Sequence, residues 1–474
     1  MAPDASVSAS VPSAGSKVTT HGPSVLGVIA VVAVLVASVA LILLYAKSLG
    51  SAAVNRLTAV PSSLRLDLTG DQWHGLAMAD AICVANAARF PSARMGRFDH
   101  LARAATRLGW GVRLRDASGN PLALTNSDVG AAMRAGAVLK LVPPKSANAS
   151  RVPSIVCRGH AISWAPRPTS TLADDKGACA RWLGGHGMPV PATVAVTLAD
   201  VGALRRRATD ALAARDIEAM LGTRSDVLGL LEPPHAKATR NSAVLKPLAG
   251  TCGRGITADL VGIHNVALAL ARSCRRTGIS RWVIEQQLHG RSYRAIIARP
   301  PSGAPARLLY ACERLPPLAI GDGIHTINEL LMINKNARTL WHPPAPTPDL
   351  DWMRHHGVDP RHCVPPSNVV VRVRMPTNWA QGGTHWRIDP RTHMHNDNVD
   401  MLCRAARCLP GRPFLVALDI VGDMMIPWHQ SGANGPRIHD VELNSGLEDI
   451  PGGCDWVPAD ESRVFDAILQ AYAA

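Results

Sequence analysis

The chain has 474 residues, of which 47% are hydrophobic and 18% are charged, and this composition excludes a wholly disordered protein. The length suffices for about two or three folded units, each with an apolar core. The net charge of +14, with His neutral, is compatible with nucleic acid, anionic lipid or acidic substrates as partners. Aromatic residues make up only 4%, which leaves few stacking platforms for single-stranded nucleic acid, so we expect no nucleic-acid partner.

The first segments of the chain are apolar or low in charge. Residues 1–24 are rich in Ser, Ala, Val and Pro and are predicted to be a disordered tail. Residues 25–46 contain no charge and are long enough, at ~1.5 Å per residue, to cross ~30 Å of hydrocarbon. We predict a retained transmembrane helix, because the stretch is longer than the ~7–15 apolar residues of a signal peptide. More basic residues follow this span than precede it, which favours a single-pass membrane protein with a cytosolic C-terminal part. A buried core helix is the alternative.

Residues 60–170 alternate helical and strand-like patches and are predicted to form a small α/β domain. Helices are expected at 80–89 and 100–108, and strands at 110–114, 137–142 and 154–157. Another helix is expected to begin near Asp174 or Asp175, either of which can cap it. A basic, Ala-rich helix is expected at 201–221.

The remainder of the chain reads mainly as strands, with helices near 265–276 and 397–408. The predicted strands are 242–247, 282–288, 294–299, 307–315, 369–374, 414–422 and 437–444. A Pro/Gly turn joins the third and fourth of these strands, which predicts a hairpin. Residues 341–366 are rich in Pro and His and are interpreted as a connecting excursion. The predicted fold class is therefore α/β, of the α+β kind.

Ten cysteines occur without a CxxC pair, and the closest two are Cys403 and Cys408. This spacing does not suit zinc, and the histidines between 355 and 395 have no Cys or acid at metal-ligand spacing to complete a site. We interpret the cysteines as free thiols in a reducing compartment.

The segment LKPLAGTCGRGI, residues 245–256, predicts a phosphate-binding loop. A strand ends near Lys246, and Gly250, Gly253 and Gly255 follow within a few positions. Glycines let backbone N–H groups approach an anion closely, and the lysine supplies a compact positive charge. The spacing is that of neither a Walker loop nor a dinucleotide fingerprint, and a Gly-rich surface turn is the alternative.

Carboxylates on two predicted strands indicate a cation site. Asp419 lies inside the apolar run FLVALDIV, where a charge is costly unless it is paired or bound to a metal. Glu442 and Asn444 are two residues apart on another strand and share a face. This oxygen set suits one or two Mg²⁺ ions, with Mn²⁺ as a substitute, and a solvated hairpin face is the alternative.

A third unit begins at Arg374, which ends a β-branched strand and is followed by Asn378 and a Gly382–Gly383 pair. A guanidinium at a strand end can bind a phosphate through two parallel hydrogen bonds. An exposed ion pair explains the same arginine equally well.

The order of these units resembles the ATP-grasp superfamily, and in particular the ATP-grasp region of cyanophycin synthetases and bifunctional glutathione synthetases. The resemblance covers about 171–460, and its most specific parts are GDGIHTINELL at 321–331 and the spacing of Arg374, Asn378 and the glycine pair. It implies an ATP-grasp fold with an N-terminal subdomain at 171–290 and a C-terminal subdomain at 291–474. Residues 60–170 would then correspond to the domain that precedes the ATP-grasp fold in this family.

The resemblance also implies an ADP-forming carboxylate–amine ligase that uses ATP and Mg²⁺. Lys176, Lys246 and the loop glycines would contact the phosphates, while Glu285 and the backbone at Leu288 would bind adenine. Arg294, Arg374 and Asn378 would face the phosphate and the developing intermediate. Asp419, Glu442 and Asn444 would bind the metal.

Three departures from the pattern leave the substrates open. Ser292 stands where these relatives usually place an acid for the ribose, and residues 445–453 differ from the relatives near the acceptor substrate. Few residues follow Asn444, so we expect neither relative's whole activity here. Partners are expected to be small-molecule or peptide carboxylates and amines, and relatives suggest a homodimer or homotetramer. A membrane-tethered ATP-binding pseudoenzyme or scaffold is the alternative function.

Overall fold

The computed structural model describes residues 60–89, 97–123, 129–144, 152–158, 161–231, 242–250, 253–337, 346–430, 435–443 and 464–474. These residues belong to one compact unit, 56–474. The predicted tail and the predicted span at 25–46 lie outside the described residues. Among the helices that are described, none has the length and apolar character needed to cross a membrane.

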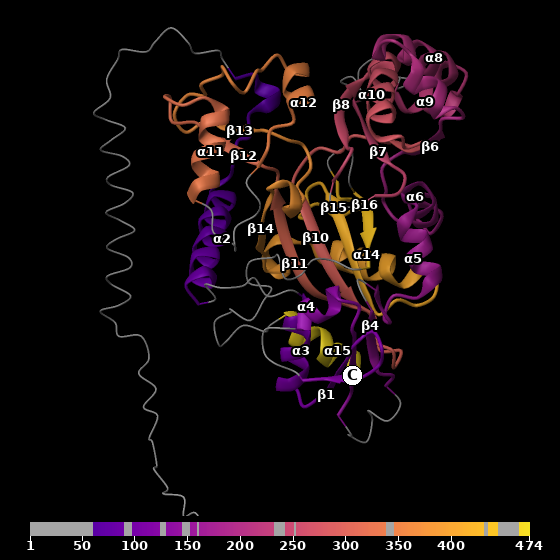
Figure 1. The fold of residues 1–474 in the computed structure, drawn as a ribbon, viewed down its shortest axis with the longest axis vertical. Coiled ribbons are helices and arrows are strands. Elements are labelled where there is room, and N and C mark those ends of the chain that lie inside the picture. The colour runs from indigo at the N-terminus through magenta and orange to yellow at the C-terminus, as the bar shows by residue number, and fades with distance from the viewer. Residues whose placement is uncertain are drawn as a thin grey trace, which may run out of the picture. The chain divides into compact units, whose positions relative to one another are not determined.

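A small antiparallel sheet comes first in the chain (Figure 1). Its strand order is β2-β1-β3-β4-β5, with β1 (Gly111–Arg115), β2 (Pro121–Leu122), β3 (Val138–Val142), β4 (Ile155–Arg158) and β5 (Ala161–Ile162). The helices around it are α3 (Arg97–Arg107), α4 (Val129–Arg134) and α15 (Val464–Ala473), which packs on α3. The helix expected at 100–108 and the three expected strands lie where they were predicted, within a few residues.

The four-stranded sheet has the order β6-β9-β7-β8, with every neighbouring pair antiparallel. Its strands are β6 (Thr193–Thr197), β7 (Ser242–Pro247), β8 (Thr257–Val261) and β9 (Arg281–Gln286). Its helices are α7 (Val201–Arg206), α8 (Asp210–Gly222), α9 (Ser225–Leu231) and α10 (Gly262–Thr277). The prediction of one helix over 201–221 is wrong, because the Thr209 side chain caps α8 by accepting from the Leu212 N–H and so starts a second helix.

The central sheet has the order β14-β11-β10-β15-β16 and is also antiparallel (Figure 1). Its strands are β10 (Ser292–Ala298), β11 (Arg307–Leu315), β14 (Thr384–Arg387), β15 (Leu415–Val421) and β16 (Arg437–Glu442). The predicted hairpin is confirmed, since β10 and β11 pair over their length. The short helix α13 (Pro390–His393) precedes α14 (Asn396–Cys408), which covers one face of the sheet.

Two apolar cores lie on the two faces of the central sheet. In β10, Ile296 and Ala298 belong to the core shared with the small sheet and α15. Ala295 and Ile297 belong to the core that includes α14. This alternation is the period of two expected for a strand buried on both faces.

A two-stranded ribbon joins β12 (Leu318–Ile320) to β13 (Val370–Arg372), with α11 (Ile327–Ala337) and α12 (Leu350–His355) beside it. Two short 3₁₀ helices are also present: η2 (Ser62–Leu64) lies near the start of the described chain, and η4 (Trp379–Gln381) follows β13. Val60 and Leu64 are buried in its core, so the start of the described chain packs on the ribbon. The helix α2 (Gly70–Arg89) packs against β14 and covers the helix expected at 80–89. Seven cysteines have side chains that the structure describes, and these seven are free, with six of them buried.

Two helices connect the small sheet to the four-stranded sheet, α5 (Arg167–Asp174) and α6 (Lys176–Gly185). Asp175 caps α6, as predicted, because its side chain accepts a hydrogen bond of 2.8 Å from the Ala178 N–H. The first residue of α6 is Lys176, whose N–H donates to the Leu248 carbonyl at 3.2 Å. The cap therefore fixes where the Lys176 side chain begins.

We predict that Asp175→Ala destabilises the fold by ~1 kcal/mol, since the first turn of α6 loses its cap. Asp200→Ala is the matched control, because Asp200 caps α7 in the same way through the Ala203 N–H. Urea unfolding should show a similar loss in the free energy of unfolding for both variants. Only Asp175→Ala should weaken the binding of a ligand that contacts Lys176. Equal ligand binding by the two variants would contradict the positioning role of this cap.

Candidate functional site

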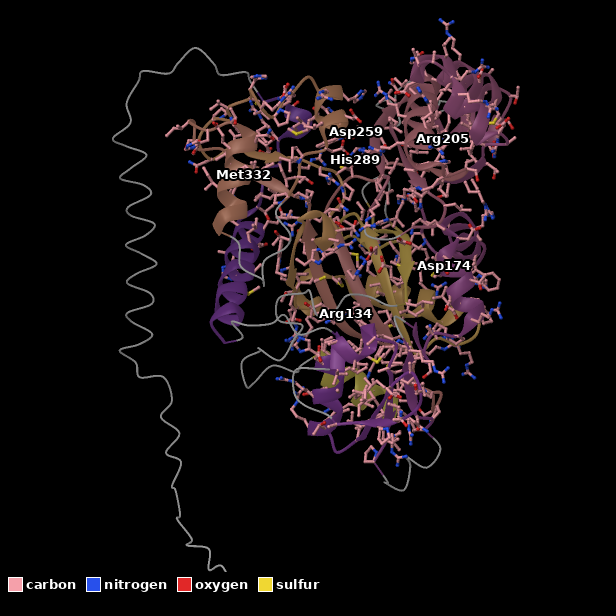
Figure 2. The ribbon with its side chains drawn as sticks, in the orientation of Figure 1. Arg134, Asp174, Arg205, Asp259, His289 and Met332 are labelled. Atoms are coloured by element: carbon pink, nitrogen blue, oxygen red, sulfur yellow. The ribbon has the colours of Figure 1, made fainter. Side chains whose placement is uncertain are left out.

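A cleft of about 680 Å³ is lined by the four-stranded sheet, the central sheet and residues 62–72. Asp259 on β8 and His289, just after β9, both line it and are labelled in Figure 2. The cleft thus collects residues from segments that are far apart in the sequence. It contains nine of the residues predicted from the sequence, which are Lys176, Lys246, Gly250, Gly253, Glu285, Leu288, Asn378, Asp419 and Glu442.

Of the other four predicted residues, the structure describes three, and none of these three lines the cleft. Arg294 is buried beside the cleft and bonds to Asp419. Gly255 and Arg374 line a neighbouring cavity of about 970 Å³. There the Arg374 side chain donates to the Gln381 side chain and, through Nε at 3.2 Å, to the Thr347 carbonyl. Asn444 and residues 445–453 lie outside the described part of the chain.

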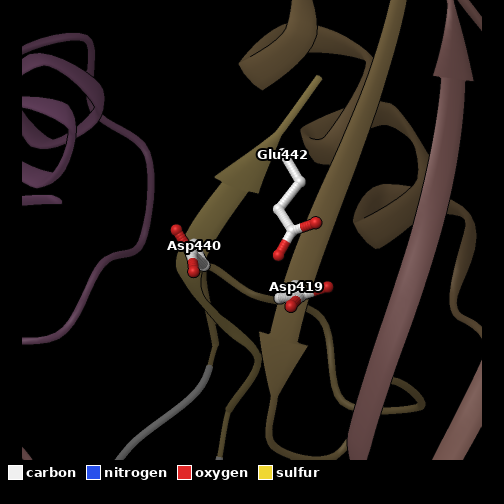
Figure 3. Close-up of side chains that lie close together, drawn as sticks. All are labelled: Asp419, Asp440 and Glu442. Atoms are coloured by element: carbon white, nitrogen blue, oxygen red, sulfur yellow. The ribbon is translucent and has the colours of Figure 1, made fainter. Parts of the chain in front are cut away.

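Three carboxylates converge in the cleft, from Asp419 on β15 and from Asp440 and Glu442 on β16 (Figure 3). One oxygen of each lies within 4.8 Å of the others. Asp440 was missed by the sequence reasoning, although its spacing of two from Glu442 placed it on the same face of the strand. Among the described residues this is the one group of three His, Cys, Asp or Glu side chains close enough to share a metal ion.

Two arginines compensate the buried charge of Asp419. Arg294 lies directly opposite Asp419 in the β10–β15 pairing, and its Nε and Nη2 donate to the carboxylate at 2.7 and 2.9 Å. Arg314 on β11 donates through Nη1 at 2.9 Å. Burial acts to raise the pKa of Asp419, but the two guanidinium charges outweigh it and hold that pKa below its ordinary value. Asp419 therefore stays ionised in a largely dry position.

The pKa of Glu442 is shifted in the opposite direction to that of Asp419. The Arg294 guanidinium, 3.4 Å away, acts to lower the pKa of Glu442. Burial together with the charges of Asp419 and Asp440 prevails and raises it above the ordinary value. Such crowding of carboxylates stores repulsion that a divalent cation would relieve, and oxygen ligands are those that Mg²⁺ prefers. The donor set thus fits a magnesium ion.

Two lysines face these acids. Lys176 contacts Asp440 at 2.7 Å, and the Asp440 charge raises the pKa of Lys176 in spite of the opposing effect of burial. Lys246 on β7 lies 2.5 Å from Glu285 on β9 and 3.4 Å from the Nδ1 atom of His439. Burial raises the pKa of Glu285 although Lys246 acts to lower it. Burial, reinforced by Lys246, lowers the pKa of His439, so this histidine is neutral.

The Gly-rich loop contacts the opposite wall of the cleft. Gly253 has a φ of 68°, in the left-handed region that favours glycine. A Cβ atom added there would lie 2.5 Å from the Oδ1 atom of Asn378 and 2.9 Å from the Cβ atom of Pro376. Gly253 therefore permits a contact between two chain segments that no larger residue could make.

Comparison with known proteins gives relatives for part of the chain. No family model matches it. Cyanophycin synthetase from Synechocystis sp. is 26% identical over 187 residues, which are 38% of this chain and 20% of that protein. The enzyme of the same name from Trichormus variabilis is 28% identical over 219 residues, 44% of this chain and 22% of that protein. The chain spans about a fifth of the length of these curated relatives, and the matches confirm the resemblance stated from the motifs.

Solved structures are similar at lower identity. A bifunctional glutathione synthetase from Pasteurella multocida is 15% identical with a TM-score of 0.39, covering 74% of this chain and 41% of that one. D-cycloserine synthetase DcsG is 16% identical with a TM-score of 0.33, covering 65% of this chain and 72% of that one.

A buried histidine beneath the cleft predicts acid sensitivity of the fold. Burial, followed by the positive charge of Arg314, lowers the pKa of His385 on β14 to about 3. The unfolded chain, with a His pKa of ~6.5, binds a proton that the folded state excludes. Stability is therefore fully present above the unfolded pKa and falls as the pH drops from ~6.5 towards 3, by up to ~1.4 kcal/mol per pH unit.

We predict that His385→Gln reduces the fall in the free energy of unfolding between about pH 7 and pH 4, as measured by urea unfolding. The exposed His362 gives the control His362→Gln, which should leave the acid profile unchanged. Parallel profiles for His385→Gln and the wild type would exclude His385 as the source.

Proposed function

We propose that this chain, a member of the ATP-grasp superfamily, is an ATP-dependent carboxylate–amine ligase that forms ADP and phosphate through an acylphosphate. The observation that carries the proposal is the meeting of two lysines and a Gly-rich loop with three carboxylates in one cleft. Lys246 contacts His439, the sequence neighbour of Asp440, so the phosphate-binding and cation-binding groups are adjacent. The sequence matches to cyanophycin synthetase support the same chemistry.

Asp419, Asp440 and Glu442 would hold one or two Mg²⁺ ions, and Mn²⁺ suits the same oxygen ligands. When bound, the metal supplies positive charge to the phosphate oxygens. Arg294 and Arg314 act on this site through Asp419, because they fix the orientation of its carboxylate from beneath. This is the positioning that metal ligands receive from a surrounding hydrogen-bonded shell.

The other wall of the cleft would bind the nucleotide. Lys176 and Lys246 would offer positive charge to a triphosphate, and the backbone amides of Gly250 and Gly253 would offer N–H donors. Glu285 and the backbone at Leu288 would contact adenine. In this proposal Lys246 exchanges part of its contact with Glu285 for a phosphate, which frees a carboxylate oxygen to accept from the adenine amino group.

The reaction itself joins two anions. A substrate carboxylate oxygen attacks the γ-phosphorus of ATP, and ADP leaves. The amine then attacks the acyl carbon, loses a proton and expels phosphate, which gives an amide. Fixed donors aimed at the developing charge are worth ~3–4 kcal/mol each. The Asn378 and Gly253 contact holds the loop against the opposite wall, which excludes water that would hydrolyse the acylphosphate.

Transfer of isotopic oxygen tests this mechanism directly. The full chain is supplied with ATP, Mg²⁺ and amino acids or peptides whose carboxylates carry heavy oxygen. Heavy oxygen should appear in the released phosphate when an amine is present, because attack of the amine on the acyl carbon expels phosphate together with the labelled bridging oxygen. Nucleotide-induced stabilisation without any turnover would instead support an ATP-binding scaffold, and no binding of ATP at all would overturn the proposal.

We predict that Glu442→Gln lowers turnover about a hundredfold or more, because the charge of a metal ligand is lost. Asp400→Asn is the control, since Asp400 is exposed on α14 and lines neither cavity. Phosphate release at saturating ATP measures the effect, and raised Mg²⁺ should partly restore the Glu442→Gln variant. Turnover equal to that of the control would remove Glu442 from the site.

We also propose, from the sequence alone, that residues 25–46 anchor the protein in a membrane with the ligase on the cytosolic side. Alkaline carbonate should leave the full chain in the membrane fraction and release a variant that lacks residues 1–46. Protease added to sealed vesicles should spare the C-terminal part if it lies inside. Recovery of the full chain in the carbonate supernatant would contradict the anchor.

A further inference from the structure

We propose that the segment 62–72 and strand β13 form a subsite of the cleft that binds an amino-acid-type zwitterion, with Arg372 and Arg65 receiving its carboxylate and Asp67 its ammonium group. The inference rests on the proposed ligase function, to which it adds a substrate class. No motif in the sequence drew attention to Arg65, Asp67 or Arg372.

The segment 62–72 is attached to the walls of the cleft by specific contacts. Arg65 pairs with Val371 in an isolated β-bridge, and the Leu66 N–H donates to the Val370 carbonyl at 3.0 Å. Further along, Thr69 accepts from the Arg291 side chain at 2.8 Å. Gln72 donates to Glu313 on β11 at 2.7 Å. The segment is therefore a built wall of the cleft, and β13 lies beside it.

Arg372 lines the cleft and forms no ion pair with any of the described acids. Its Nη2 donates to the Ser63 carbonyl at 2.9 Å, its Nη1 contacts the Met375 sulfur at 3.2 Å, and its guanidinium lies 5.6 Å from the Trp352 ring centre. Its buried Nε atom has no hydrogen-bond partner in the described structure. Burial lowers the pKa of Arg372 although the charge of Asp259 partly offsets it. A guanidinium held in this way is stabilised by an incoming carboxylate.

Two neighbours complete the charge pattern. Arg65 lines the cleft, and within the described structure its side chain donates only to the Val60 carbonyl, at 2.8 Å. Asp67 also lines the cleft, two residues further on. The other acids of the cleft are engaged, whereas no described side chain or backbone group bonds to Asp67. Those engaged acids are Asp259, Glu285, Asp419, Asp440 and Glu442.

This combination of charges selects a class of ligand. A ligand with phosphate groups alone would be repelled by Asp67, and a ligand with amines alone would be repelled by Arg65 and Arg372. A molecule with a carboxylate and an ammonium group close together satisfies both signs. Since the same cleft contains the groups proposed to bind ATP, the zwitterion would be held next to the nucleotide as a reactant.

The experiment measures amino-acid binding and nucleotide binding separately on the full chain. Saturation-transfer NMR with the standard L-amino acids identifies the best binder, which is then compared with its N-acetyl and C-amide derivatives. Fluorescent ATP reports the nucleotide site and the integrity of the fold. We expect binding of at least one free amino acid and loss of binding when either end is blocked.

The variants assign each end of the ligand. Asp67→Asn should weaken the free amino acid about tenfold and abolish its advantage over the N-acetyl derivative, because a charged hydrogen bond is lost. Arg372→Gln should also weaken binding of the free amino acid, and it should abolish the advantage of the free amino acid over its C-amide derivative. Arg372→Lys should restore part of the affinity for the free amino acid. Both variants should retain the wild-type affinity for fluorescent ATP. Asp400→Asn and Arg215→Gln, both at exposed helical positions, are the matched controls.

Three results would overturn the inference. One is normal ATP binding with no amino-acid binding. Another is that the Asp67→Asn variant still prefers free amino acids over their N-acetyl derivatives. Asp67 is exposed, and ATP binding verifies that this variant is folded. The third is a loss of ATP affinity in Arg372→Gln with intact amino-acid binding, which would assign this arginine to the nucleotide. Failure of the wild type to bind ATP would refute the ligase proposal instead. The NMR measurement of amino-acid binding does not depend on ATP and would still test the subsite.

Discussion

The architecture of the cleft depends on keeping one carboxylate charged inside a sheet. Asp419 occupies an apolar strand, where an unpaired charge costs several kcal/mol. The antiparallel register places Arg294 opposite it, and β11 brings Arg314 to the Oδ2 atom, which also accepts from Arg294. All three side chains share the strand face that further along carries Ile296, Cys312 and Ala417. The sheet is therefore apolar where it packs on the small sheet and becomes charged where it reaches the cleft.

Charge compensation extends from Asp419 to the two lysines of the cleft. Lys176 pairs with Asp440, and Lys246 pairs with Glu285, so each cation is already neutralised by an acid. A triphosphate alone would take the lysines and leave carboxylates facing each other. A divalent cation alone would take the carboxylates and leave lysines unpaired. A magnesium-bound triphosphate exchanges both kinds of partner at once, which is why the arrangement favours the metal complex over either component.

The sequence predicted those parts of the site that depend on local patterns. An acid within an apolar strand marked Asp419, and glycines after a strand marked the loop at Gly253. Strand periodicity also explains why the hairpin of β10 and β11 was found. Arg314 was missed because it follows Glu313 near the end of its strand, and only the register of three strands shows that its partner is Asp419. Arg374 was selected by its motif, but its side chain lies in the neighbouring cavity, bonded to Gln381.

The contribution of the N-terminal segment could not be read from the sequence at all. Arg65 and Val371 are separated by some three hundred residues, and nothing in either local pattern indicates that they pair. The sheets fix the groups proposed for phosphoryl chemistry, because a one-residue slip would turn every side chain to the other face. The segment 62–72 lies outside these sheets, so its exposed residues, such as Arg65 and Asp67, can change without disturbing that register. Selection of the substrate is thereby separated from the chemistry. The central and four-stranded sheets keep the charged centre, whereas the segment and Arg372 of β13 supply the charges proposed to face the reactant.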